Sequence, residues 1–147
     1  MIDTVTTEPA SRNEAIDAKW GAALSAGFVA VPNVLIKHQR KLNITQNEFT
    51  VIMNLLLHWW YKDKMPFPST RNIAERSGLE VRTIQRALQS LQSKKMIEKV
   101  KQDDKFVFNL EGLRAQLEAY AKTDLWSITK IAQSSNVVEM ESTPELT

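Results

Sequence analysis

Residues 69–89, STRNIAERSGLEVRTIQRALQ, decide the fold, because their pattern predicts two short helices joined by a tight turn. Ser69 is an N-cap residue whose hydroxyl accepts a hydrogen bond from a free backbone N–H of the first helix. Gly78 stands at the turn, where positive φ needs a residue without Cβ. Ala74 is small where the two helices would touch. The positions that the helix pair must bury are apolar, at Ile73, Leu79, Ile84, Ala87 and Leu88.

The second predicted helix separates apolar side chains from basic and amide ones. At about 100° per residue, its core face holds Val81, Ile84, Ala87, Leu88 and Leu91. The outer face holds Arg82, Arg86, Gln89 and Ser93, flanked by Gln85 and Thr83. Such a stripe also suits any solvated surface helix. On the second helix of a turn motif, Arg and Gln match guanine and adenine edges. We therefore predict a helix-turn-helix on duplex DNA, with base contacts from Arg82, Thr83, Gln85, Arg86 and Gln89.

Length and composition bound the class of protein. A chain of 147 residues, 43% hydrophobic, can bury one core of ordinary domain size and leave flanking segments. Without cysteine it has neither disulfides nor thiolate metal sites nor cysteine catalysis. Apolar runs such as 51–57 are too short to span a bilayer, and the first ten residues lack the features of a signal peptide. We expect a cytoplasmic, nucleoid-associated protein.

Charge is distributed unevenly along the chain. Residues 28–101 carry thirteen basic and five acidic side chains, a net charge of +8. Residues 1–27 carry −2 and residues 102–147 carry −4. The positive charge is thus concentrated on the segment with the motif, as expected of a surface that displaces counterions from phosphate.

Upstream of the motif, Thr45 and Glu48 form the pattern of a capping box. It predicts a helix over about 46–61 with Phe49, Ile52, Met53, Leu56 and Trp60 on its core face. The aromatic run 59–61 is either the end of this core or a base-stacking platform. A shorter helix is expected from Pro32 to about Lys41. The basic end of that helix, at Lys37, Arg40 and Lys41, either meets phosphate or favours the helix dipole.

Downstream, residues 96–101 alternate apolar and charged side chains, and residues 106–108 do so after the turn 102–105. A β-hairpin is predicted, and directly after a recognition helix it is a wing. Its lysines either approach DNA or keep an edge strand soluble. The predicted phosphate contacts are Ser69, Arg71, Lys94, Lys95, Lys99, Lys101 and Lys105.

Further apolar residues follow at helical spacing. They indicate a dimer or partner surface, or else a packed terminal helix, and comprise Leu113, Leu117, Tyr120, Leu125, Ile128 and Ile131. At the other end, residues 11–14 could cap a helix that Gly21 interrupts. The predicted organisation is a partly disordered arm over 1–27, a winged-helix domain over 28–110, a helical segment over 111–133 and an acidic disordered tail over 134–147. The fold class is mostly α with a small β-hairpin, a winged helix-turn-helix with flanking helices.

The pieces FVAVPNVLI, LNITQNEFTVIMNLLLHWW and PFPSTRNIAERSGLEVRTIQRALQSLQSKKMIEKV, with the short wing, cover residues 28–108. This arrangement resembles the winged-helix domain of bacterial, phage and plasmid replication-initiation-type proteins, including the DnaD-like proteins. The resemblance implies duplex binding, with Arg82, Thr83, Gln85 and Arg86 at recognition positions. Glu80 departs from the usual Ser, Thr or Asp cap of the recognition helix, and either accepts from cytosine N4 or repels phosphate.

Catalysis is not expected, and neither is a cofactor or a metal. His38 and His58 are the only histidines, and their spacing suits neither a metal site nor a triad. The leading hypothesis is a sequence-specific transcriptional repressor of a mobile or phage-like element that acts as a homodimer. The alternative is a replication or partition accessory protein that binds origin repeats and recruits a partner. A third reading is a winged helix that binds protein, which the +8 segment argues against.

Overall fold

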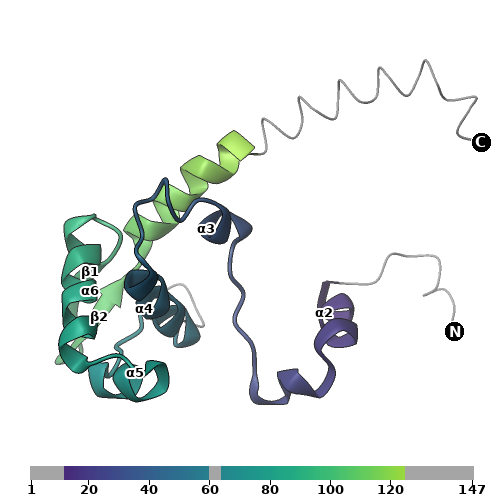
Figure 1. Cartoon of the computed structure of the whole chain (residues 1–147), viewed down its shortest axis with the longest axis horizontal. Helices are drawn as coiled ribbons and strands as arrows, with labels where there is room; N and C mark the ends of the chain where they lie inside the picture. The colour runs from purple at the N-terminus through teal and green to yellow at the C-terminus, as the bar shows by residue number, and fades with distance from the viewer. Residues whose placement is uncertain (1–11, 60–63, 125–147) are drawn as a thin grey trace, which may run out of the picture. The chain divides into compact units, whose positions relative to one another are not determined.

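The computed structural model describes residues 12–59 and 64–124, and Figure 1 shows the order of its elements. The chain divides into two compact units, Met1–Ala30 and Val31–Thr147. The first contains helix α2 (Arg12–Trp20) and the 3₁₀ helix η1 (Gly21–Ala26). The interruption expected at Gly21 is confirmed, since its φ of +58° ends α2.

The second unit is a mostly α winged helix-turn-helix. Four helices come first, α3 (Asn33–Lys37), α4 (Gln46–Leu57), α5 (Thr70–Ser77) and α6 (Val81–Ser93). The antiparallel hairpin of β1 (Glu98–Gln102) and β2 (Lys105–Asn109) follows, and residues 111–124 form a further helix. Helix α4 packs on α5 and α6 (Figure 1). The predicted fold class is therefore confirmed for the described residues.

Helix α4 begins as the sequence predicts and ends earlier. The capping box is present, with the Thr45 hydroxyl accepting from the Glu48 N–H and the Thr45 N–H donating to the Glu48 carboxylate. The helix ends at Leu57 rather than near residue 61, because the next two N–H groups bond three residues back and tighten the last turn. Residues 60–63, including Trp60, lie outside the described residues.

The core face of α4 is rotated from its predicted position. Val51 and Leu55 are fully buried together with Ile52, whereas Phe49 and Met53 are only half-buried. The helix packs on both α5 and α6, so the buried arc is set by two neighbours. A helical wheel uses only the sequence of α4, so it cannot predict where α5 and α6 contact the helix.

Helix α3 is also shorter than predicted, because it ends at Lys37 and gives way to consecutive turns over 38–43. These turns are closed by backbone bonds from Leu42 to His38 and from Ile44 to Gln39, both 2.9 Å. Leu42 and Ile44 are thereby buried, which an uninterrupted helix to Lys41 would not achieve.

The predicted hairpin is confirmed, with β1 beginning two residues later than the sequence pattern and the other three strand ends differing by one residue. Asp103 and Asp104 form the turn with φ of +52° and +64°, the two positive angles that a type I′ hairpin requires. Lys99 lies opposite Phe108, and Lys101 opposite Phe106. The Phe108 N–H donates to the Pro66 carbonyl at 2.8 Å. That bond anchors the hairpin to the segment that leads into α5.

The helix over 111–124 belongs to this unit. Leu113 and Leu117 are 2% and 7% exposed, and the Leu113 N–H donates to the Met96 carbonyl at 2.8 Å. A Cβ on Gly112 would lie 1.9 Å from the Lys95 carbonyl oxygen, so the helix touches that backbone directly. The Gln116 amide donates to the Lys94 carbonyl at 3.2 Å. Of the two alternatives for this segment, the packed terminal helix therefore applies at Leu113 and Leu117, which are buried within the chain and do not form a free partner surface.

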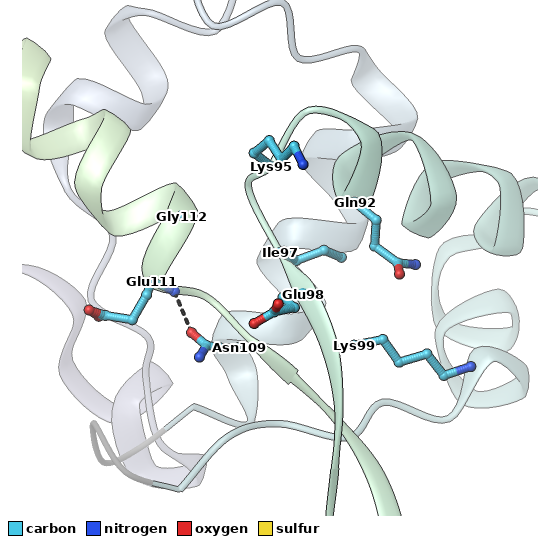
Figure 2. Close-up of a pocket in the computed structure, with 8 residues that line it drawn as sticks. All are labelled: Gln92, Lys95, Ile97, Glu98, Lys99, Asn109, Glu111 and Gly112. Carbon is cyan, nitrogen blue, oxygen red and sulfur yellow. Dashed lines mark hydrogen bonds between the residues drawn. The ribbon is translucent and has the colours of Figure 1, made fainter.

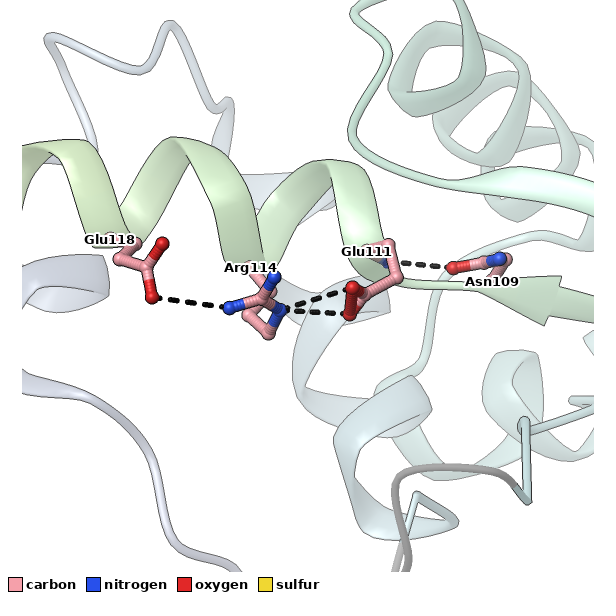
Figure 3. Close-up of polar contacts among 4 residues, drawn as sticks. All are labelled: Asn109, Glu111, Arg114 and Glu118. Carbon is pink, nitrogen blue, oxygen red and sulfur yellow. Dashed lines mark hydrogen bonds and ion pairs between the residues drawn. The ribbon is translucent and has the colours of Figure 1, made fainter.

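The far end of the same helix is held at α3. The Tyr120 ring stacks on His38, with centroids 4.8 Å apart, and His38 Nε2 lies 2.9 Å from the Asp124 carboxylate. The outer side carries an exposed charge ladder in which Arg114 pairs with Glu111 at 2.8 Å and with Glu118 at 3.2 Å (Figure 3). The other predicted partner residues, Leu125, Ile128 and Ile131, and the predicted tail lie outside the described residues.

Candidate nucleic-acid interface

The helix-turn-helix is built by the local contacts that its sequence predicts. Ser69 Oγ accepts from the Asn72 N–H at 3.1 Å and caps α5. Gly78 has φ of +78°, and its N–H closes the helix on the Ala74 carbonyl at 2.9 Å. Glu80 precedes α6 without a side-chain capping bond, which agrees with its being a poor cap.

Burial divides α6 much as the wheel predicts. Ile84, Ala87, Leu88 and Leu91 are buried. Val81, which the wheel assigns to the core face, is instead 39% exposed, because it is the first residue of α6 and lies at the end of the packed region. Leu79 is half-buried in the turn. The helix thus turns its basic and amide face outward.

A groove of about 750 Å³ runs between α6 and the wing. Four of the predicted base-contacting residues line its α6 side, namely Arg82, Gln85, Arg86 and Gln89. Lys99 and Phe106 line the wing side, and Leu88 and Phe108 contribute apolar surface between the two. Sequence reasoning missed Phe106 and Phe108 as groove residues, although the strand pairing that places them beside Lys99 and Lys101 could have indicated them.

The α6 side chains of this groove have free hydrogen-bonding capacity. Within the described part of the chain, Arg82, Gln85, Arg86 and Gln89 make no hydrogen bond or ion pair. Gln92 differs, because its amide donates to the Leu88 carbonyl of its own helix at 3.3 Å. Free guanidinium and amide groups on an exposed helix face are what reading base edges requires.

Thr83 lies elsewhere than predicted. It is half-buried and lines a second cavity of about 280 Å³ between α6 and the start of α4, together with Thr45, Glu48 and Ser90. Arg86 borders both this cavity and the groove. Thr83 lies on the flank of α6 that faces α4, whereas Gln85 lies on the flank that faces the wing. The structure therefore does not bring Thr83 into the groove with the four other predicted base contacts.

Lys94 has an internal partner instead of a free ammonium. Its Nζ lies 2.6 Å from a carboxylate oxygen of Glu48, which is 3% exposed, and it also donates to the Asn43 carbonyl. Burial alone would raise the pKa of Glu48. The hydrogen bonds from Lys94, Ser90 and the Thr45 N–H outweigh burial and hold that pKa below its ordinary value. The prediction of Lys94 as a phosphate contact is replaced by a structural role, because a buried carboxylate needs this charge.

The remaining candidate phosphate contacts surround the groove unevenly. Ser69 and Arg71 are exposed at the start of α5, and Lys101 is exposed on the wing. Lys99 and Lys105 hold their ammonium groups 4.7 and 4.8 Å from the rings of Phe106 and Phe67. Lys95 lines a different cavity, of about 370 Å³, beside Glu98 and Glu111, and Lys99 borders this cavity as well as the groove (Figure 2).

These features define a helix-turn-helix domain, a class of domain that binds DNA. Residues 42–97 match the model of a family described as a helix-turn-helix domain. The match runs from the turns before α4 to the residue before β1, and it does not extend to the replication-initiation type that the resemblance implies. A search of curated proteins gives no match to the chain. None of the described helices is long and apolar enough to cross a membrane.

Proposed function

We propose that the protein is a sequence-specific duplex-DNA-binding protein that regulates transcription, acting as a dimeric repressor. The observation that carries DNA binding is the groove between α6 and the wing. Its α6 side offers two guanidinium and two amide groups without internal partners among the described residues, and these side chains match guanine and adenine edges.

In the proposed complex, α6 lies in the major groove and its outer face contacts the bases. Arg71, Lys99 and Lys101 bind phosphates. These contacts fix the register of α6 and carry no sequence information by themselves. The protein acts by occupying its site, without catalysis and without a cofactor. We place it in the cytoplasm, on the nucleoid.

Arg86 offers the sharpest test of base reading, because it lies on the outer face of α6 and lines the groove. Arg86→Ala should weaken binding to the specific site by roughly 1–3 kcal/mol and change binding to random DNA little. Arg76→Ala, at an exposed arginine in the last turn of α5, is the matched control. Equal losses on specific and random DNA would reduce Arg86 to a phosphate contact.

The biological role is tested by mapping the bound sites across the genome and footprinting them. A dimeric repressor should protect an inverted repeat near its own promoter, with half-sites about one helical turn apart. Direct repeats within an origin would instead identify a replication or partition accessory protein. Failure to bind any duplex at low salt would refute both roles.

A further inference from the structure

One side chain in the groove is not explained by folding. Phe106 lies in β2, one residue from the hairpin turn, and it is 58% exposed on the side of the groove that faces the charged and amide groups of α6. An exposed phenylalanine contributes little to the core. Its position on the wing side of the groove, opposite the outer face of α6, places an apolar ring within the interface.

Phe106 also has a cation beside it. The Lys99 ammonium lies 4.7 Å from the centroid of the ring, a cation–π geometry. The strand register explains the contact, because Lys99 and Lys101 are on the same face of the hairpin as their cross-strand partners Phe108 and Phe106. The ring and the ammonium both line the groove.

An apolar ring next to a cation matches the two parts of a nucleotide, an anionic phosphate joined to an apolar sugar and base. We propose that Phe106 and Lys99 form a nucleotide-binding subsite in the wing. The ammonium contacts the phosphate, and the ring packs on the deoxyribose or the base of that nucleotide. The inference rests on the proposed function, because it assigns a subsite within the same DNA interface.

The chain contains a matched comparison for this subsite. Phe67 is 55% exposed and has the Lys105 ammonium 4.8 Å from its ring. Like Phe106, it is thus an exposed phenylalanine in a cation–π contact with a lysine. It differs in place, since Phe67 is not among the residues that line the groove. If exposure and a neighbouring lysine were enough, both phenylalanines would contact DNA equally. If the groove is the binding site, only Phe106 should.

The experiment compares Phe106→Ala with Phe67→Ala in the full-length chain, by equilibrium binding to the mapped duplex. Removing an aromatic ring that packs on a nucleotide should weaken binding roughly five-fold or more, whereas Phe67→Ala should stay within about two-fold of the wild type. Thermal unfolding of both variants checks the fold, which exposed side chains should barely affect. Equal affinities of the two variants would overturn the subsite.

The salt dependence of binding gives a second measurement. Its slope should not change if Lys99 only stabilises the hairpin. Lys99→Ala should reduce the slope of log K against log salt by about 0.9, because one phosphate contact is lost, and Phe106→Ala should leave the slope unchanged. Unchanged affinity and slope in Lys99→Ala would also refute the subsite. Abasic nucleotides placed in turn along the duplex separate the two sources. If the ring packs on a base, removing that base should weaken binding of the wild type but not of Phe106→Ala. If the ring packs on deoxyribose, no abasic position should affect the wild type more than Phe106→Ala.

The two proposals fail differently. If the wild type binds no duplex, the proposed function itself is refuted. If Arg86→Ala loses specific binding while Phe106→Ala does not, DNA reading by α6 stands and the wing subsite is wrong.

Discussion

Gly112→Ala places a methyl group where the backbones of two segments meet. The new Cβ would be 1.9 Å from the Lys95 carbonyl oxygen and 3.2 Å from that of Met96. Both neighbours are backbone atoms, which cannot turn aside as a flexible side chain would. Restoring an ordinary contact requires the start of the terminal helix to move by roughly 1.5 Å.

The cost follows from the contacts that such a movement breaks. The Leu113 N–H donates to the Met96 carbonyl at 2.8 Å and the Gln116 amide to the Lys94 carbonyl at 3.2 Å, so the displacement takes the first bond out of range and strains the second. Each bond contributes about 0.5–1.5 kcal/mol. Loosened packing of Leu113 and Leu117 adds about 1–3 kcal/mol, and the better helix propensity of alanine returns up to about 1 kcal/mol. The net destabilisation should be about 2–4 kcal/mol.

Urea unfolding followed by circular dichroism measures this free energy, and a thermal scan should show a decrease in Tm of roughly 10–20 °C. Ala115→Gly, at an exposed position of the same helix, is the control for propensity and should cost about 1 kcal/mol. A Gly112→Ala variant as stable as the wild type or more stable, as helix propensity alone would make it, would show that the terminal helix does not dock through this backbone contact.

Two further predictions concern the paired carboxylates. Lys94→Ala should destabilise the fold by about 1–3 kcal/mol, because it leaves the buried Glu48 carboxylate short of a partner. Since the folded-state pKa of Glu48 is lowered, its contribution is present above the unfolded-state pKa and disappears as pH falls through the folded-state pKa. Urea titrations of Lys94→Ala and wild type between pH 7 and pH 3 should therefore converge, and a constant difference would contradict the pairing. The pKa of Asp124 is lowered chiefly by its hydrogen bond with His38, so Asp124→Asn should speed hydrogen exchange in the last turn of the terminal helix at neutral pH. Equal hydrogen-exchange rates in Asp124→Asn and the wild type would contradict a stabilising contact between Asp124 and His38.

Elements set by local contacts were predictable from the sequence. The caps at Thr45 and Ser69 and the turn at Gly78 depend on groups within four residues of each other, and all three are present. The outer face of α6 was predictable for the same reason, since a wheel needs only the period of the helix. Positions set by distant neighbours were not. Nothing near Gly112 in the sequence indicates that the Lys95 carbonyl will approach it.

Lys94 changes what the net charge of +8 means for DNA binding. A count along residues 28–101 treats every basic side chain as available to phosphate, but the Lys94 ammonium is 2.6 Å from a buried carboxylate and would leave that carboxylate unpaired if it turned to DNA. Lys95 and the wing residue Lys99 both border a second cavity, which Glu98 and Glu111 also line. Unlike Lys94, the lysines of the wing and the arginines of α6 make no ion pair among the described residues. Affinity for DNA should therefore follow the groove side chains, and the charge of the segment as a whole overstates the number of phosphates that it neutralises.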